Sequence, residues 1–230
     1  MQHLFPGGAP LALLLAVTAV FSYFCGCFNG AVIVSKYILR DDVRTHGSGN
    51  AGLTNFHRTF GGPLTLVVIL CDVLKAVAAI LIALWLAGRF DPRIMPDFPL
   101  EQALADYYAV LFKYWAGLFC LLGHMFPCMF HFKGGKGILS GGTIAIMIDW
   151  RIALVVWGGF LVLVVLTRYV SLGSCFAGAA FPVCSLVLYR DGVITVLALL
   201  IGGLILYMHR GNIHRLLTGT ENKLSFHKRK

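Results

Sequence analysis

Three short polar stretches hold most of the residues that could do chemistry in this chain. The first runs from Asp42 to Arg58 and contains Gly47, Gly49 and Gly52 at two- and three-residue spacing. Backbone N–H groups in such a glycine-rich turn can converge on an anion. The neutral donors of this stretch are Ser48, Asn50, Thr54 and Asn55, and its cations are Arg44 and Arg58. The pattern favours a phosphate site, and the alternative is a polar loop rich in turn residues.

The second stretch, Phe132-Lys133-Gly134-Gly135-Lys136-Gly137, comes directly before an apolar segment. A lysine between glycines at the start of a helix brings an ammonium and N–H groups together at the positive end of the helix dipole, which suits phosphate. The stretch is not a Walker A loop, because Gly137 stands where that loop needs Ser or Thr and Phe130 stands at its first glycine. An ATPase is therefore disfavoured. The alternative is a lysine that snorkels at a membrane edge.

The third stretch runs from His209 to Lys223. If the preceding helix continues, His209, Arg210 and Asn212 lie within one turn, and Asn212 shares the face of His209 because it is three residues further on. Such a group could hold a polar substrate at the membrane surface. A basic tail that stops membrane insertion is the alternative.

The elements that must position these stretches are membrane helices. Hydrophobic residues make up 58% of the 230-residue chain and charged residues only 13%, against about 25% charged in soluble domains. Six apolar segments approach spanning length: 11–34, 63–88, 105–126, 152–167, 171–189 and 193–208. Residues 137–148 would reach only about 18 Å as a helix, against a hydrocarbon core of about 30 Å. We therefore predict an all-α integral membrane protein, one polytopic domain over residues 1–230, with seven membrane helices of which one is short and half-buried.

The basic residues predict the orientation of these helices. If the N-terminus lies outside, thirteen of the 19 Lys and Arg residues fall on the inner side, and only Arg89, Arg93, Arg151 and Arg190 fall on the outer side. The C-terminus is then inside, and all three polar stretches face the cytoplasm. The net charge of +9 indicates contact with anionic headgroups and phosphorylated substrates, not with nucleic acid, since basic residues alternate with apolar runs.

Several other polar or reactive residues have simpler interpretations. The seven cysteines are odd in number and lie mostly in apolar runs, so we expect buried small side chains and no metal site. Asp72 and Lys75 are three residues apart and could neutralise each other, and His124 is expected to be a hydrogen-bonded core histidine. The sequence contains no His-x4-Asp, Gly-x-Ser-x-Gly or His-Glu-x-x-His motif and no obvious nucleophile, which favours direct transfer between substrates.

Taken in order, the three stretches resemble the bacterial acyl-phosphate–glycerol-3-phosphate acyltransferases, the PlsY family. The resemblance extends from about residue 25 to residue 224. It is carried by Gly47-Ser48-Gly49-Asn50, Thr54-Asn55, Arg58, Gly134-Gly135-Lys136-Gly137, His209-Arg210, Asn212, Arg215-Leu216, Gly219 and Glu221. One departure is Cys25-Gly26-Cys27-Phe28-Asn29-Gly30, where the family usually has a Gly-Ser-Ile-Pro-like sequence at the end of the first span.

The resemblance implies the first acylation of phospholipid synthesis: acyl phosphate and glycerol 3-phosphate give lysophosphatidate (1-acyl-glycerol 3-phosphate) and phosphate, in the cell membrane and without a cofactor. It implies catalytic roles for Ser48, Arg58, Lys136 and His209. It implies substrate binding by Gly47, Gly49, Asn50, Thr54, Asn55, Gly134, Gly135, Gly137, Arg210, Asn212 and Glu221, the last orienting a neighbour. Membrane lipids and the enzyme that makes acyl phosphate are the expected partners. The general base is either His209 or the phosphate of the substrate.

Two rival functions remain open from the sequence. A carrier or flippase for a phosphorylated solute or lipid would share the helices, the glycine breaks and the cations. The lack of internal repeats and the one-sided polar stretches speak against it. A membrane scaffold for lipid enzymes is the third hypothesis.

Overall fold

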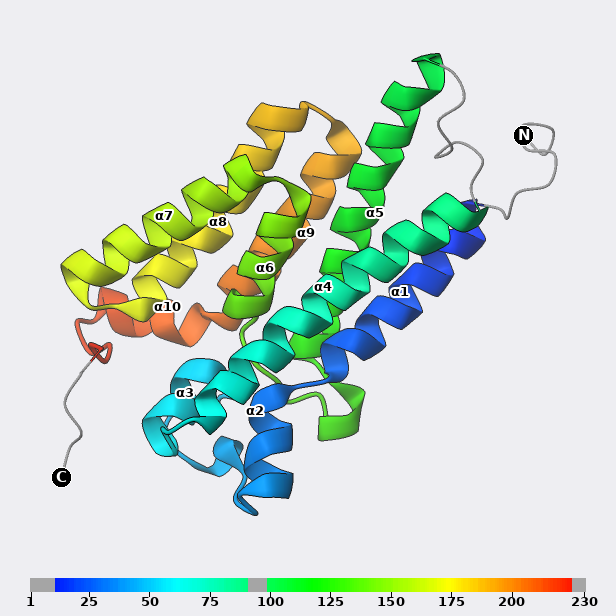
Figure 1. The fold of residues 1–230 in the computed structure, drawn as a ribbon. Helices are drawn as coiled ribbons and strands as arrows, with labels where there is room; N and C mark the ends of the chain where they lie inside the picture. The colour runs from blue at the N-terminus through cyan, green and yellow to red at the C-terminus, as the bar shows by residue number, and fades with distance from the viewer. Residues whose placement is uncertain (1–10, 91–98, 225–230) are drawn as a thin grey trace. The chain divides into compact units, whose positions relative to one another are not determined.

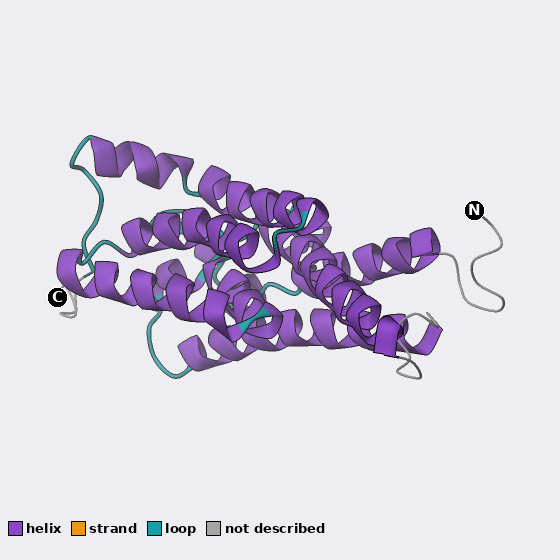
Figure 2. Cartoon of the chain, turned by 90° about the horizontal axis from the view of Figure 1, so that it is seen from above, coloured by secondary structure: helices purple, strands orange, loops and turns teal. Residues whose placement is uncertain are grey.

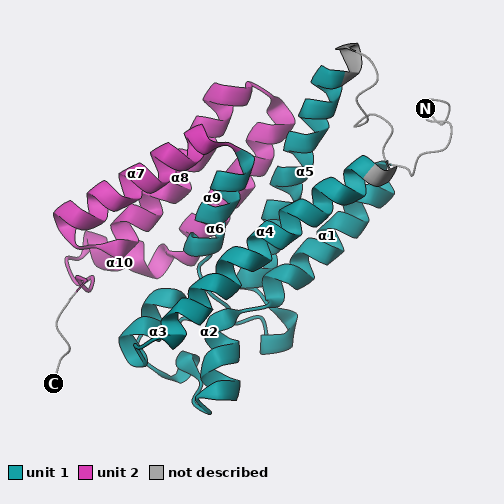
Figure 3. Cartoon of the chain, viewed as in Figure 1, with its two compact units in different colours: residues 1–148 teal, residues 149–230 magenta. Residues whose placement is uncertain are grey.

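The computed structural model describes residues 11–90 and 99–224, and every regular element in these residues is helical (Figures 1 and 2). They fall into two compact units, residues 1–148 and residues 149–230 (Figure 3). The all-α prediction is confirmed for the described residues. The prediction of one domain stays a prediction, and Arg93 and the basic residues 228–230, which entered the charge count, lie outside the described residues.

The first unit is built on three long helices, with short elements between them. The long helices are α1 (Leu11–Cys27), α4 (Leu64–Phe90) and α5 (Pro99–Met125). The shorter elements are α2 (Gly30–Ile33), a π-helical turn (Val34–Ile38), two 3-10 turns (Val43–Thr45 and Cys128–Phe130), α3 (Leu53–Thr59) and α6 (Ile138–Ile148).

Close backbone packing joins α1 to α5. A Cβ atom on Gly26 would collide with the carbonyl oxygen of Cys120, and one on Gly123 would collide with that of Tyr23. Small residues at such crossings let membrane helices approach closely, where dispersion contacts replace the missing hydrophobic drive. The crossing brings the C-terminal end of α1 next to the C-terminal end of α5, where the second polar stretch begins.

The chain breaks its helix between α1 and α2, in the segment that departs from the family pattern. Asn29 is extended at this break, and its side chain accepts a hydrogen bond from Val32 N (3.1 Å) and donates one to Ala51 O (3.1 Å). An asparagine cap of this kind satisfies helix N–H groups that would otherwise be unpaired. The predicted span over residues 11–34 is therefore bent, and it continues to Ile38.

A small apolar core fixes the first polar stretch on α4. Phe56 of α3 is fully buried against Ala31, Val43 and Val68. Complete burial of a phenylalanine side chain contributes roughly 1.5–3 kcal/mol. This packing anchors α3, so that the glycine-rich loop in front of α3 has a fixed base.

The second unit consists of four helices: α7 (Trp150–Thr167), α8 (Val170–Tyr189), α9 (Gly192–Met208) and α10 (Arg210–Leu217). Between α9 and α10 the axis bends by 60°. The helical turn survives the bend, because Ile213 N still donates to His209 O at 2.8 Å. The helix therefore continues into the third stretch with a bend, and His209 and Asn212 lie within one turn as predicted.

Five of the described helices are long and apolar enough to cross a membrane, and α9 with α10 makes a sixth if the bent pair is one span. The α6 helix is apolar but shorter, with 11 residues, as expected. Its residues are largely buried in the protein, which suits a helix too short to cross a bilayer alone.

Candidate active site

Asn55 holds the first glycine-rich loop together. Its amide nitrogen lies 3.0 Å from Val43 O, 3.0 Å from His46 O and 3.1 Å from Asn50 O, and its oxygen accepts from Ser48 N at 3.1 Å. The residue is only 2% exposed. Asn55 therefore shapes the loop from within. Its predicted contact with substrate stays a prediction.

The loop can take this shape because two of its residues are glycines in the left-handed region. Gly47 has φ +53° and Gly49 has φ +68°, conformations that cost other residues energy. A Cβ atom on Gly47 would also collide with Oδ1 of Asn55. The two glycines thus serve the turn that carries Ser48.

Three candidate side chains of this loop and α3 are exposed: those of Ser48, Thr54 and Arg58. Among the described residues, no ion pair involves Arg58, so its guanidinium charge is not cancelled by a neighbouring carboxylate. A hydroxyl group on a rigid turn with an uncompensated cation on the following helix can bind an anion.

Arg44 differs from what the sequence indicated for the loop's cations. Its guanidinium pairs with Asp42 at 2.6 Å and donates to Phe130 O at 2.9 Å. The hydrogen bond from Arg44 lowers the pKa of the Asp42 carboxyl from its ordinary value. Arg44 is therefore charge-balanced and joins the first loop to the second, and its role in ligand binding stays a prediction.

The second loop folds back on the end of α5. Gly134 N donates to Met125 O and Gly135 N to His124 O, both at 3.1 Å. A Cβ atom on Gly135 would collide with the imidazole of His124. Lys136 is half-buried and stands two residues before the first residue of α6, as expected from the sequence. The lysine thus stands directly before the positive end of a helix.

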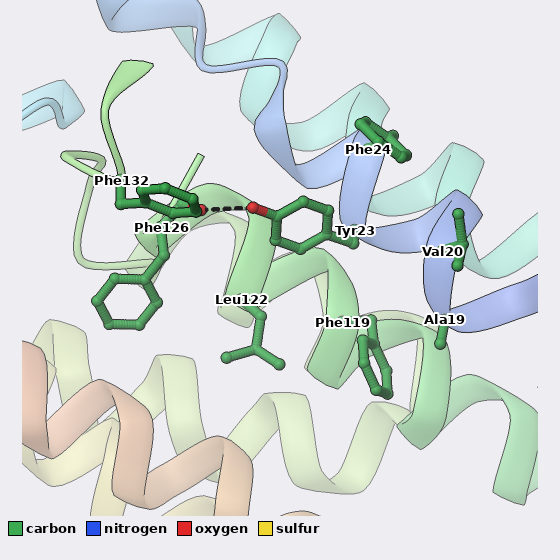
Figure 4. Close-up of a pocket in the computed structure, with 8 residues that line it drawn as sticks. All are labelled: Ala19, Val20, Tyr23, Phe24, Phe119, Leu122, Phe126 and Phe132. Atoms are coloured by element: carbon green, nitrogen blue, oxygen red, sulfur yellow. Dashed lines mark hydrogen bonds between the residues drawn. The ribbon is translucent and has the colours of Figure 1, made fainter. Parts of the chain in front are cut away.

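An apolar groove lies between α1 and α5 (Figure 4). It has a volume of about 410 Å³, and one of its lining residues, Phe132, belongs to the second loop. Tyr23 donates from its hydroxyl group to Phe126 O at 2.8 Å at the loop end of the groove. The lining residues are Ala19, Val20, Tyr23, Phe24, Phe119, Leu122, Phe126 and Phe132. A hydrocarbon chain whose polar head lies at the second loop fits this surface.

In the second unit, Glu221 gathers three side chains. Its carboxylate accepts from Ser171 Oγ (3.0 Å), Asn212 Nδ2 (2.8 Å) and Arg215 Nε (2.7 Å). Burial raises the pKa of the Glu221 carboxyl, but these three hydrogen bonds outweigh the burial, so the pKa is lowered overall. The prediction that Glu221 orients a neighbour is supported by its contact with Asn212.

His209 and Arg210 occupy different environments at the bend. His209 is 4% exposed, and its Nδ1 lies 2.8 Å from Ile205 O. A carbonyl oxygen only accepts, so Nδ1 of His209 carries a proton. Arg210 is exposed, donates to Tyr207 O at 2.9 Å and lies over the Tyr207 ring. Substrate binding by Arg210 stays a prediction.

The structure brings the predicted residues of the first two stretches together within the first unit. Those of the third stretch cluster around Glu221 and the bend in the second unit. The sequence analysis missed the positioning roles of Asn29 and Arg44. The position of Asn29 before Gly30 was the available signal, because asparagine is a preferred helix cap. Among the described residues, no three His, Cys, Asp or Glu side chains are grouped as metal ligands.

Comparisons with known proteins agree on one family. A family model described as glycerol-3-phosphate acyltransferase matches residues 16–219. A glycerol-3-phosphate acyltransferase of Thermoanaerobacter pseudethanolicus is 34% identical over 208 residues, which cover 90% of this chain and 94% of that protein. One of Shouchella clausii is 36% identical over 214 residues, with 91% and 96% covered.

A solved structure leads to the same family. The crystal structure of PlsY, described as an integral membrane glycerol 3-phosphate acyltransferase in its glycerol 3-phosphate form, matches with a TM-score of 0.75 and 30% identity. The match covers 92% of this chain and 96% of that one. A second structure of PlsY, in a lysophosphatidic acid form, matches with a TM-score of 0.72. The chain belongs to the glycerol-3-phosphate acyltransferase (PlsY) family.

Proposed function

We propose that this membrane protein transfers a fatty acyl group from acyl phosphate to glycerol 3-phosphate and releases lysophosphatidate and phosphate. One observation supports the proposal beyond family membership: the apolar groove is lined by Phe132 of the second loop, which also holds the half-buried Lys136, and Arg44 joins this loop to the first. A substrate with a fatty chain and a phosphate head needs both features.

The reaction needs no covalent enzyme intermediate. The 1-hydroxyl oxygen of glycerol 3-phosphate attacks the acyl carbonyl carbon, the bond from that carbon to the phosphate oxygen breaks, and phosphate leaves with the electron pair. The donor is a mixed anhydride and is already activated. The protein therefore contributes orientation and stabilisation of developing negative charge. We assign that work to Ser48, Arg58 and Lys136, with the chain in the groove.

The hydroxyl proton requires a base. His209 is held at the bend between α9 and α10 by the hydrogen bond from Nδ1 to Ile205 O, and an imidazole fixed in this way can orient glycerol 3-phosphate. The substrate phosphate has a second pKa of about 6, so its dianion can take the proton at neutral pH. We assign orientation to His209 and Asn212, and proton removal to the substrate.

We further propose seven membrane segments, counting α6 and the bent α9–α10 pair, with the N-terminus outside and the C-terminus inside. The asymmetry of the basic residues supports this orientation. Engineered single cysteines at residues 50, 133 and 222 should then react with a membrane-impermeant reagent only from the cytoplasmic side. Labelling of any of them from the outside would contradict a shared cytoplasmic site.

The test of the function is turnover by the purified protein in detergent. Palmitoyl phosphate with labelled glycerol 3-phosphate should give labelled lysophosphatidate, and palmitoyl-CoA in place of palmitoyl phosphate should give little. Equal or faster turnover with palmitoyl-CoA would refute the proposal that acyl phosphate is the acyl donor. No product in detergent, together with uptake of glycerol 3-phosphate into proteoliposomes, would indicate a carrier instead.

A further inference from the structure

Lys75 of α4 is a buried ammonium with three acceptors. It is 6% exposed, and its Nζ lies 2.6 Å from Asp72 Oδ1, 2.6 Å from His124 Nδ1 and 3.3 Å from Phe28 O. The pairing with Asp72 was predicted from their spacing and is confirmed. An ammonium has three N–H donors, so these contacts use all of them. An ion pair at this depth is costly to bury and is weak evidence for a purely stabilising role.

His124 on α5, one of the three acceptors, connects Lys75 to the second loop. His124 accepts from Lys75 at Nδ1, so the proton of the neutral ring is on Nε2, the atom nearest to the Cβ position of Gly135. The carbonyl oxygen of the same His124 accepts from Gly135 N. Lys75 thus orients the imidazole of His124, the ring that lies against Gly135 in the loop that carries Lys136.

The carbonyl oxygen of Phe28, directly after α1, connects Lys75 to the first loop. Phe28, whose carbonyl oxygen accepts from Lys75, directly precedes Asn29. Asn29 caps α2 and donates to Ala51 O, in the segment between Asn50 and α3. The same Ala51 oxygen lies beside the Cβ position of Gly135. One ammonium therefore connects to both loops, through His124 to the second loop and through Phe28 and Asn29 to the first.

We propose that Lys75 is a positioning residue for the acyl transfer: with Asp72 as its counter-ion, it holds the two glycine-rich loops in their phosphate-binding geometry through His124 and Phe28. The kinetic part of this inference rests on the proposed function, whereas its structural part does not. Without Lys75, each loop exists in the correct arrangement for only a fraction of the time. Substrate then selects that fraction, which raises KM but restores kcat at saturation.

The test uses the double variant Asp72→Asn/Lys75→Met, which removes both charges together. Removal of Lys75 alone would leave a buried carboxylate unpaired and could unfold the protein. The matched control is Lys113→Met, since Lys113 is also a lysine in a membrane helix, with one recorded contact at 3.4 Å to Ile148 O. We expect KM for glycerol 3-phosphate and palmitoyl phosphate to rise about tenfold in the double variant, with kcat within about threefold. The control should keep both parameters.

A second measurement does not depend on turnover. Hydrogen exchange of the peptides that cover residues 47–52 and 133–137 should quicken by about tenfold in the double variant, since the two loops then spend more time away from their backbone hydrogen-bond partners. Peptides of α8 should not change. If the double variant cannot be purified, His124→Asn, which keeps an acceptor for Lys75, is compared with His124→Leu, which removes it. KM should then be at least about fivefold higher for the leucine variant.

Several results would overturn the proposal. An unchanged KM with a lower kcat means that active protein was lost, and Lys75 is then structural. A fall in kcat beyond about tenfold at saturation places Lys75 in the chemistry itself. If hydrogen exchange of the loop peptides is unchanged, or quickens equally in all peptides, Lys75 does not hold the loops. Equal KM values for the two His124 variants would lead to the same conclusion. If the wild type makes no lysophosphatidate, the proposed function fails, and the exchange experiment alone decides on Lys75.

Discussion

Replacement of the side-chain amide group of Asn55 by a carboxylate should disable the first loop. In Asn55→Asp, the side chain keeps its shape and can still accept from Ser48 N, but the amide donor that faces three backbone carbonyl oxygens becomes a carboxylate oxygen. The amide has two N–H donors and a net hydrogen bond contributes about 0.5–1.5 kcal/mol, so the loss amounts to about 1–3 kcal/mol before repulsion is counted. At about 1.4 kcal/mol per factor of ten, kcat/KM should fall by at least about fivefold.

The assay compares Asn55→Asp with Asn222→Asp, the same chemical change at an exposed position. Both proteins are purified in detergent and assayed with palmitoyl phosphate and glycerol 3-phosphate. We expect near-wild-type kinetics for the control and faster amide exchange around Ser48 for the Asn55 variant. If Asn55→Asp retains kcat/KM within about threefold and an unchanged exchange rate, the loop does not depend on this side chain, and the account of the first loop is wrong.

Three further predictions concern the other parts of the site. Lys136→Ala should lower kcat/KM about 100-fold without rescue by arginine, whereas Lys133→Ala should stay within about threefold. The pKa of Glu221 in the folded protein lies below its ordinary value of 4.5, so its contribution to stability should persist as the pH falls to about 5 and be lost only below 4.5. Melting curves recorded at a series of pH values test this. The Glu221→Gln variant should melt at a lower temperature than the wild type at pH 7. Val20→Trp should fill the groove, so that KM for palmitoyl phosphate rises by a factor at least about fivefold larger than the factor for an eight-carbon acyl phosphate. Val17→Trp, outside the groove, should not produce this difference.

The helices could be predicted because bilayer thickness sets their length and composition. The apolar runs gave their approximate ranges, and residues 137–148 were recognised as too short from their length alone. The bends at Asn29 and between α9 and α10 could not be predicted in the same way. Helix breaks at such positions depend on partners elsewhere in the chain, such as Ala51 for Asn29, and an apolar run does not reveal them.

The sequence predicted which stretches form the candidate site, but it predicted the role of each residue in them less well. Polar loop residues that bind a ligand and those that hold the loop look alike in a sequence. Asn55 and Arg44 turned inward because backbone carbonyls and Asp42 offered partners. The Asp72–Lys75 pair followed from helical spacing, but the links of Lys75 to His124 and Phe28 come from other helices. Such long-range contacts have no signal in local periodicity.

The most direct test of the central claim is whether the acyl group ever leaves phosphate without its acceptor. The purified protein is incubated with palmitoyl phosphate and radiolabelled inorganic phosphate, first without and then with glycerol 3-phosphate. Direct transfer predicts no labelled palmitoyl phosphate in the first incubation, and equal amounts of lysophosphatidate and newly released phosphate in the second. Labelled palmitoyl phosphate formed without glycerol 3-phosphate would reveal an acyl-enzyme and contradict the account.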